Sequence, residues 1–198
     1  DSNKQIKLSM GEYSIDWLML NINRSDIAFD DRVKVAANIK ELTKINQSVL
    51  YEEVSSDVNL EYILAGTSIK ENIIIGKYSS NNIFTFEYKT KGLEMKKDDE
   101  ENIIFVNENG KTVFSFEQLY MIDAKGETST NIRVNFTMTG NKTYLITIIP
   151  DDTWLRTAAY PVTVDPSLVS AVTNFSIYDT YISESDPNTK YYNQQLMY

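Results

Sequence analysis

Several of the side chains that most often perform enzyme chemistry are missing from this sequence. The 198 residues include no Cys and no His. This excludes disulfides, thiolate metal sites, a Cys nucleophile and the Ser-His-Asp triad. The usual general base and the usual zinc ligand are missing as well. Catalysis would have to depend on carboxylates, Lys or Tyr, and we expect no catalytic residues, no metal ion and no cofactor.

Two carboxylate clusters are the remaining candidates. The run 98–101 (Asp-Asp-Glu-Glu) has oxygen ligands suited to Ca²⁺ but lacks the EF-hand spacing and its Gly, which favours a solvated turn. Asp151 and Asp152 lie beside Trp154 and could form a glycosidase-like acid pair. Adjacent residues do not give the opposed geometry, about 5–9 Å apart, that such chemistry needs. Capping of one helical turn is therefore the favoured role.

Lys70 and Glu71 follow a predicted hairpin turn. Adjacent strand residues point to opposite faces, so the two cannot both be buried on one side. We expect a structural charge pair across strands, with Glu61 as the candidate partner. A Lys–Asn isopeptide cross-link with a carboxylate helper is the alternative.

Aromatic residues offer a different kind of site. Trp17 and Trp154, together with 13 Tyr residues, are the candidates for stacking on a carbohydrate. Aromatic side chains on alternating strands usually belong to the core instead. Both readings stay open from the sequence.

The overall charge limits the partners. The net charge is −9 and the pI is about 4.6, whereas phosphate backbones and anionic membrane surfaces attract basic proteins. No apolar run approaches the ~20 residues that span a bilayer. We expect no nucleic-acid partner and no membrane insertion.

Period-two alternation dominates the chain and indicates the elements that must position these side chains. It occurs at 6–10, 13–20, 49–51, 58–64, 69–75, 83–89, 103–106, 112–116, 119–122, 132–138, 144–149 and 160–164. Turn residues separate these segments, and Asn109-Gly110 is the strongest turn signal. This spacing predicts an all-β protein, an antiparallel two-sheet β-sandwich with few short helical turns. Phe84, Phe86 and Tyr88 should share its buried face.

Three parts are predicted along the chain: a β-sandwich module at 1–166, a short linker at 167–175 and a truncated start of a following β domain at 176–198. The charged stretch from about Arg24 to Ser48 should lie over an edge or an end. One or two strands cannot bury an apolar face alone. The tail should therefore either be disordered or dock on a sheet edge of its own molecule or of a neighbour, for example in a strand-swapped homodimer, and docking is the favoured reading.

A series of motifs resembles a segment of large secreted proteins of Gram-positive bacteria that carry DNRLRE domains and Rhs/YD repeats, the wall-associated protein A group. The motifs are Val49-Leu50-Tyr51, Val58-Asn59-Leu60-Glu61-Tyr62, Ile69-Lys70-Glu71-Asn72-Ile73-Ile74, Phe84-Thr85-Phe86, Gly110-Lys111-Thr112-Val113-Phe114, Tyr120-Met121-Ile122-Asp123, Trp154-Leu155 and Tyr160-Pro161-Val162-Thr163-Val164-Asp165-Pro166. Residues 179–198 resemble the opening of a DNRLRE domain. Asn59 and Asn72 depart from the pattern, since the family usually has Asp at the first and Asp or another polar residue at the second.

The resemblance implies an extracellular or cell-wall-associated location and supplies no catalytic residues. We therefore expect a non-catalytic structural or spacer module, not an enzyme, whose partners are neighbouring domains of the same polypeptide. The alternative is a carbohydrate- or cell-wall-binding module that binds cell-wall polysaccharide. A carboxylate-based glycoside hydrolase is the third reading.

Overall fold

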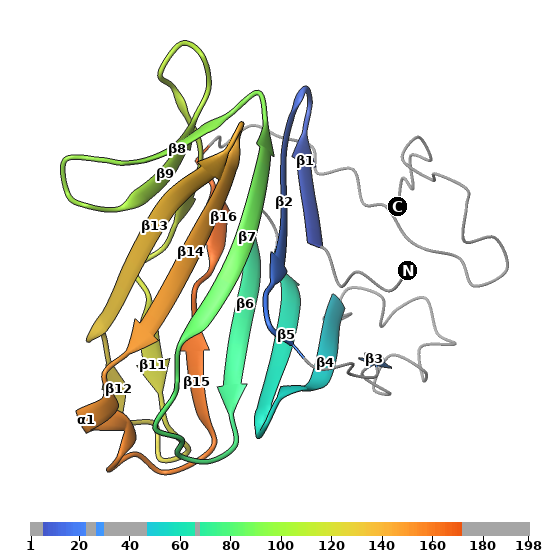
Figure 1. Ribbon diagram of the computed structural model, residues 1–198. Helices are drawn as coiled ribbons and strands as arrows, with labels where there is room; N and C mark the ends of the chain where they lie inside the picture. The colour runs from blue at the N-terminus through green and yellow to red at the C-terminus, as the bar shows by residue number, and fades with distance from the viewer. Residues whose placement is uncertain (1–5, 23–26, 30–46, 66–67, 172–198) are drawn as a thin grey trace, which may run out of the picture.

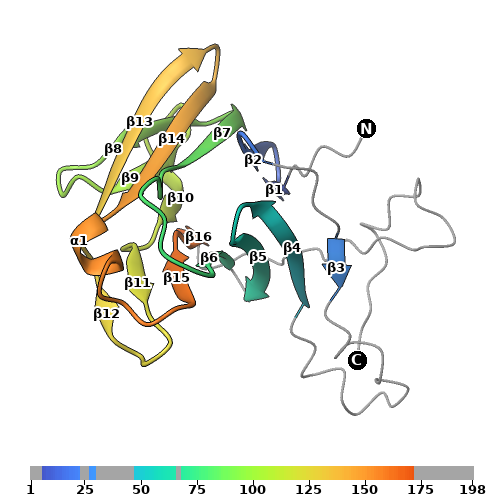
Figure 2. The same cartoon turned by 60° about the horizontal axis from the view of Figure 1, so that its bottom comes forward.

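The computed structural model describes residues 6–22, 27–29, 47–65 and 68–171, and the statements below concern these residues. They form two antiparallel sheets packed face to face (Figure 1, Figure 2), which confirms the predicted sandwich. Sheet A consists, in spatial order, of β1 (Ile6–Met10), β2 (Tyr13–Met19), β7 (Phe84–Lys91), β14 (Thr143–Pro150) and β13 (Ile132–Gly140).

Sheet B has eleven described strands and is branched. Its strands are β3 (Ile27–Phe29), β4 (Gln47–Ser55), β5 (Val58–Ala65), β6 (Ser68–Ile75), β8 (Glu94–Lys97), β9 (Ile103–Val106), β10 (Thr112–Phe116), β11 (Tyr120–Ile122), β12 (Thr128–Ser129), β15 (Val162–Asp165) and β16 (Leu168–Ser170). The described helix α1 (Asp152–Leu155) is capped by Asp151, which accepts from the backbone N–H groups of Thr153 and Trp154. No helix among the described residues is long and apolar enough to cross a membrane.

Strand β6 is the branch point of sheet B. One of its edges pairs with β5, and the other pairs first with β15 and then with β16. Val162 lies opposite Ile75 and Leu168 opposite Ile69, so β15 and β16 keep one register along β6. Within the predicted 167–175 linker, residues 168–170 form a strand that pairs with both β6 and β10.

The core lies between the sheets and follows the predicted alternation. Phe84, Phe86 and Tyr88 are buried on one face of β7. Trp17 stacks on Tyr88 with ring centroids 5.7 Å apart and an interplanar angle of 2°. Tyr88 also contacts Phe105 of sheet B, so aromatic rings join the two layers.

Two predicted features fall mainly outside the described residues. Of the charged stretch 24–48, the structure describes only β3 and the start of β4, which are paired strands of sheet B. The tail 176–198 is not described, so its docking and the following domain stay predictions. The division into three parts also stays a prediction.

Candidate functional site

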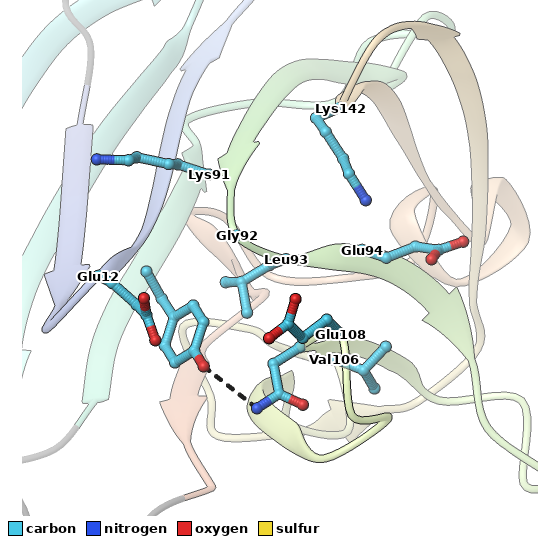
Figure 3. A pocket seen from close by; sticks show the side chains of 10 residues that line it. Glu12, Lys91, Gly92, Leu93, Glu94, Val106, Glu108 and Lys142 are labelled. Atoms are coloured by element: carbon cyan, nitrogen blue, oxygen red, sulfur yellow. Dashed lines mark hydrogen bonds between the residues drawn. The ribbon is translucent and has the colours of Figure 1, made fainter.

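A groove with a volume of about 520 Å³ opens at one end of the sandwich. Four connections line it: the β1–β2 turn, the β7–β8 turn, the β9–β10 turn and the β13–β14 turn (Figure 3). The lining residues are Glu12, Tyr13, Lys91, Gly92, Leu93, Glu94, Val106, Asn107, Glu108 and Lys142. Both sheets contribute, so the fold itself brings these distant segments together.

Two turn residues shape the groove. Gly92 has φ of +69°, and a Cβ at this position would lie 2.8 Å from Cδ1 of Tyr13. Only glycine lets the Tyr13 ring lie directly on this backbone. Asn107 fixes the other end of the ring, because its Nδ2 donates to the Tyr13 hydroxyl over 3.3 Å. Its Oδ1 accepts from the backbone N–H groups of Asn109 and Lys111, which closes the β9–β10 turn.

Five charged side chains lie around the groove. Lys142 and Glu108 extend over the groove, whereas Lys91 and Glu94 extend to opposite sides (Figure 3). Glu12 completes the set. The structure gives none of the five an ion pair with another described residue. Their charges are therefore open to a ligand.

The groove has groups for proton transfer and for charge stabilisation. A carboxylate such as Glu108 can accept a proton, and an ammonium such as Lys142 can stabilise a developing negative charge. No described side chain hydrogen-bonds either group to orient it. With three carboxylates against two ammoniums, the groove suits a ligand of mixed charge better than a polyanion.

A second polar cluster lies on the outer face of sheet B, where β15 ends. Nζ of Lys70 lies 2.9 Å from Oδ2 of Asp165. Ser167 donates to Oδ1 of the same carboxylate, and Tyr120 interacts with both Lys70 and Asp165. The hydrogen bond to Asp165 raises the pKa of Lys70 above its ordinary value. Asp165 is 3% exposed, so this ion pair is structural.

The expected pairing of Lys70 or Glu71 with Glu61 was wrong. The register places Asn72 opposite Glu61, and Nδ2 of Asn72 donates to that carboxylate over 2.9 Å. The pairing of β15 with β6 instead brings Asp165 to Lys70. Sequence alternation places a charge on a face but does not identify its partner 95 residues away.

Glu71 points the other way, into the core between the sheets, and is 2% exposed. Tyr62 donates its hydroxyl to Oε1 of Glu71 over 2.7 Å. Burial acts against the charged form of Glu71, whereas Tyr62 and then the nearby indole N–H of Trp17 act to lower its pKa, although the indole N–H does not reach hydrogen-bonding geometry. Burial is the dominant cause and raises the pKa of Glu71 from 4.5 to about 8. Glu71 is therefore mostly protonated at neutral pH.

The two tryptophans have different environments. Trp17 is 1% exposed, with one face on Tyr88 and its edge against Tyr62. In this structure it offers no face to a sugar, because the sandwich core encloses it. Trp154 is half-buried in α1, and sugar stacking there stays a prediction.

The Asp151–Asp152 pair divides into two structural roles. Asp151 caps α1, as predicted. Asp152 accepts from the Tyr78 hydroxyl over 2.9 Å and from Nε of Arg156 over 2.8 Å. These two partners, Tyr78 first, lower the pKa of Asp152. The hydrogen bond from Tyr78 to Asp152 connects the β6–β7 loop to α1.

The groove residues were not among the sequence candidates. The turn signal at Asn109-Gly110, which adjoins the groove residues Asn107 and Glu108, was recognised. What the sequence did not give is that this turn lies at the same end of the sandwich as the other turns that line the groove, since that depends on strand order. The local signal in the sequence is a charged residue beside each turn, such as Lys91, Glu94 and Glu108, but this signal does not show that the residues lie together.

Three Bacillus proteins match the chain, each at 30% identity over 154 residues. They are tRNA nuclease WapA of Bacillus subtilis strain 168, tRNA3(Ser)-specific nuclease WapA of Bacillus spizizenii and tRNA(Glu)-specific nuclease WapA of Bacillus subtilis subsp. natto. The chain is similar to a segment of WapA. The match covers 74% of this chain but only 6% of the length of each relative. No family model matches the chain, and no solved structure matches it.

The names agree with the resemblance to the wall-associated protein A group, whereas nothing found supports the DNRLRE part. They overturn the expected non-catalytic structural or spacer module and the expectation that this is not an enzyme, because all three WapA relatives are named nucleases. The carbohydrate-binding and glycoside hydrolase readings gain no support from them. The missing His and Cys describe this segment alone, whereas the WapA names describe far longer proteins.

Proposed function

We propose that this chain is a segment of a polypeptide that cleaves tRNA. The observation that carries the proposal is the 30% identity, over 154 residues, to three WapA proteins that are each named tRNA nucleases. The chain spans about 6% of their length, so the proposal concerns the whole polypeptide that contains it, here called the parent polypeptide.

The similarity supports the class of substrate and not one particular tRNA. Two relatives are named for different tRNAs, one for a serine tRNA and one for a glutamate tRNA. Both match this chain with the same identity over the same length. The matched segment therefore does not distinguish the two substrates.

The parent polypeptide is also proposed to be located outside the cell or in the cell wall. The resemblance to the wall-associated protein A group supports this location. Fractionation of cells into medium, wall and cytoplasm tests it with an antibody to this chain. Detection in the cytoplasmic fraction alone would contradict it.

A cleavage assay tests the activity. Purified parent polypeptide is incubated with total bacterial tRNA, and the products are separated on a denaturing gel, with 5S ribosomal RNA as the control substrate. Defined tRNA fragments are expected while the control RNA stays intact. Intact tRNA of every species after incubation with folded polypeptide would overturn the proposal.

The 198-residue chain is assayed alongside the parent polypeptide. If it cleaves tRNA, Glu108→Gln and Lys142→Met test the groove, and Glu117→Gln, exposed and outside the groove, is the matched control. Our expectation that this chain has no nucleic-acid partner of its own stays a prediction, based on its net charge of −9. A gel shift of tRNA by the 198-residue chain at physiological salt would contradict that expectation.

A further inference from the structure

The outer edge of β13 differs from the other described sheet edges. At the opposite edge of sheet A, β1 has five residues and carries Lys7. In sheet B, β8 carries Lys96 and Lys97, whereas β3 and β12 have three and two residues. Short edges and lysines prevent unwanted strand addition. Strand β13 has nine residues and neither Lys nor Pro, and it lies at the margin of sheet A (Figure 1).

The backbone of β13 offers hydrogen-bonding groups along this edge. The Asp151 N–H donates to the Asn131 carbonyl, which makes that position a hydrogen-bonded pair. Hydrogen-bonded and non-hydrogen-bonded pairs alternate along an antiparallel ladder. Ile132 and its partner Pro150 therefore form a non-hydrogen-bonded pair, as suits a proline without an N–H. By the same alternation, alternate backbone groups along β13 point away from β14.

The residues whose backbone faces outward also form an apolar stripe. Ile132, Val134 and Phe136 are only partly buried against the core, and Met138 is 57% exposed. Arg133, on the other face of the strand, is exposed and has no ion pair with a described residue. The edge thus presents hydrogen-bonding groups, apolar surface and one free positive charge.

We propose that an extended segment of the parent polypeptide, from outside this chain, pairs with β13 and adds a sixth strand to sheet A. This inference rests on the proposed function only in taking the chain to be part of a longer polypeptide. The segment has apolar residues at alternate positions, which cover the stripe at Val134, Phe136 and Met138. It carries an Asp or Glu that lies opposite Arg133.

Charge favours this occupant over a second copy of the chain. Antiparallel pairing of two β13 strands would bring Arg133 of one copy towards the turn that carries Lys142 of the other. Each copy also has a net charge of −9, so two copies repel each other at long range. A segment with a carboxylate opposite Arg133 has neither disadvantage.

Hydrogen–deuterium exchange with single-amide resolution tests the proposal. The N–H groups of Val134, Phe136 and Met138 are compared between the parent polypeptide and the 198-residue chain. We expect exchange about 100-fold slower in the parent polypeptide, because an added strand protects these amides. The inward amides of Asn135 and Thr137 should exchange at similar rates in both and serve as the internal reference.

Two matched substitutions in the parent polypeptide complete the test. Met138→Lys places a charge on the stripe and should reduce the protection by about tenfold or more. Ile83→Lys makes the same change in charge at another exposed apolar residue, 51% exposed, and should leave the protection unchanged. Protection that Met138→Lys does not alter would overturn the proposal.

Other outcomes also decide it. Fast exchange at these amides in both proteins means that the edge is open, which overturns it. Protection of these amides already in the 198-residue chain overturns it as well, and it identifies a second copy if the protection increases with concentration or a segment of the chain itself if it does not. Exchange is independent of nuclease activity, so tRNA cleavage without protection contradicts this inference alone, and protection without cleavage contradicts only the proposed function.

Discussion

At the scale of single residues, Glu71 links stability to pH. Its pKa of about 8 in the folded protein exceeds the ordinary value of 4.5 because burial penalises the charged form. The folded state therefore binds more protons than the unfolded state between pH 4.5 and 8. The contribution of Glu71 is full below pH 4.5 and is lost as the pH rises through that window, by up to about 1.4 kcal/mol per pH unit.

Glu71→Gln removes this dependence, since a neutral amide does not titrate. The stability of the variant relative to the natural chain should rise between pH 5 and 8, as measured by urea unfolding at half-unit intervals. All other titratable groups are common to the two proteins, so the difference between the two curves isolates Glu71. Parallel curves from pH 5 to 8 would show that Glu71 is ionised inside the core.

At the scale of elements, the β7–β8 turn depends on Gly92. Gly92→Ala places a methyl group 2.8 Å from the Tyr13 ring at φ of +69°, whereas Gly110→Ala meets nothing within 4 Å at φ of +75°. We expect losses of about 2–4 kcal/mol for Gly92→Ala and about 1–2 kcal/mol for Gly110→Ala in denaturant unfolding. The difference measures the contact that shapes the groove. Equal losses would mean that the Tyr13 ring moves aside freely.

The junction of β15 with β6 depends on the Lys70–Asp165 pair. Lys70→Met leaves the Asp165 carboxylate buried without its cation and should cost about 1–3 kcal/mol. The exposed pair of Lys89 with Glu87 is the control, and Lys89→Met should cost at most about 1 kcal/mol. A double variant with Asp165→Asn should lose less than the sum of the two single changes. Strict additivity would mean that the pair is not coupled.

The sequence predicted the local features of single strands and turns well, but it did not predict which strands lie side by side. The stripe of Phe84, Phe86 and Tyr88, the Asn109-Gly110 turn and the Asp151 cap depend on local chemistry, and all three are present. The Lys70–Asp165 pair and the groove depend on which strands lie side by side. Alternation carries no such information, so the groove could not be predicted from the sequence.

At the scale of the whole molecule, two truncations test the boundary of the sandwich. A chain that ends at Pro166 lacks β16, which pairs with both β6 and β10. We expect this chain to have a much lower melting temperature or to fail to fold. A chain that ends at Ala171 keeps all described strands. Equal melting temperatures of the two truncated chains would show that β16 is dispensable.

The Ala171 truncation also tests the undescribed tail. The prediction that 176–198 docks by strand addition requires a lower melting temperature, or fewer copies per particle by light scattering, when the tail is removed. If neither value changes, that prediction is wrong.

The branch at β6 has a consequence for how this protein forms during synthesis. The β5–β6 hairpin is local and can form early. The other edge of β6 pairs only with strands from residues 162–170. This edge therefore stays unpaired while the residues between Ile75 and Val162 are synthesised. Until then, a strand that ends in Ile73, Ile74 and Ile75 keeps an unpaired edge. The pairing that completes sheet B is therefore slow and late. Chaperones that bind exposed strands have the longest time to bind at the edge of β6.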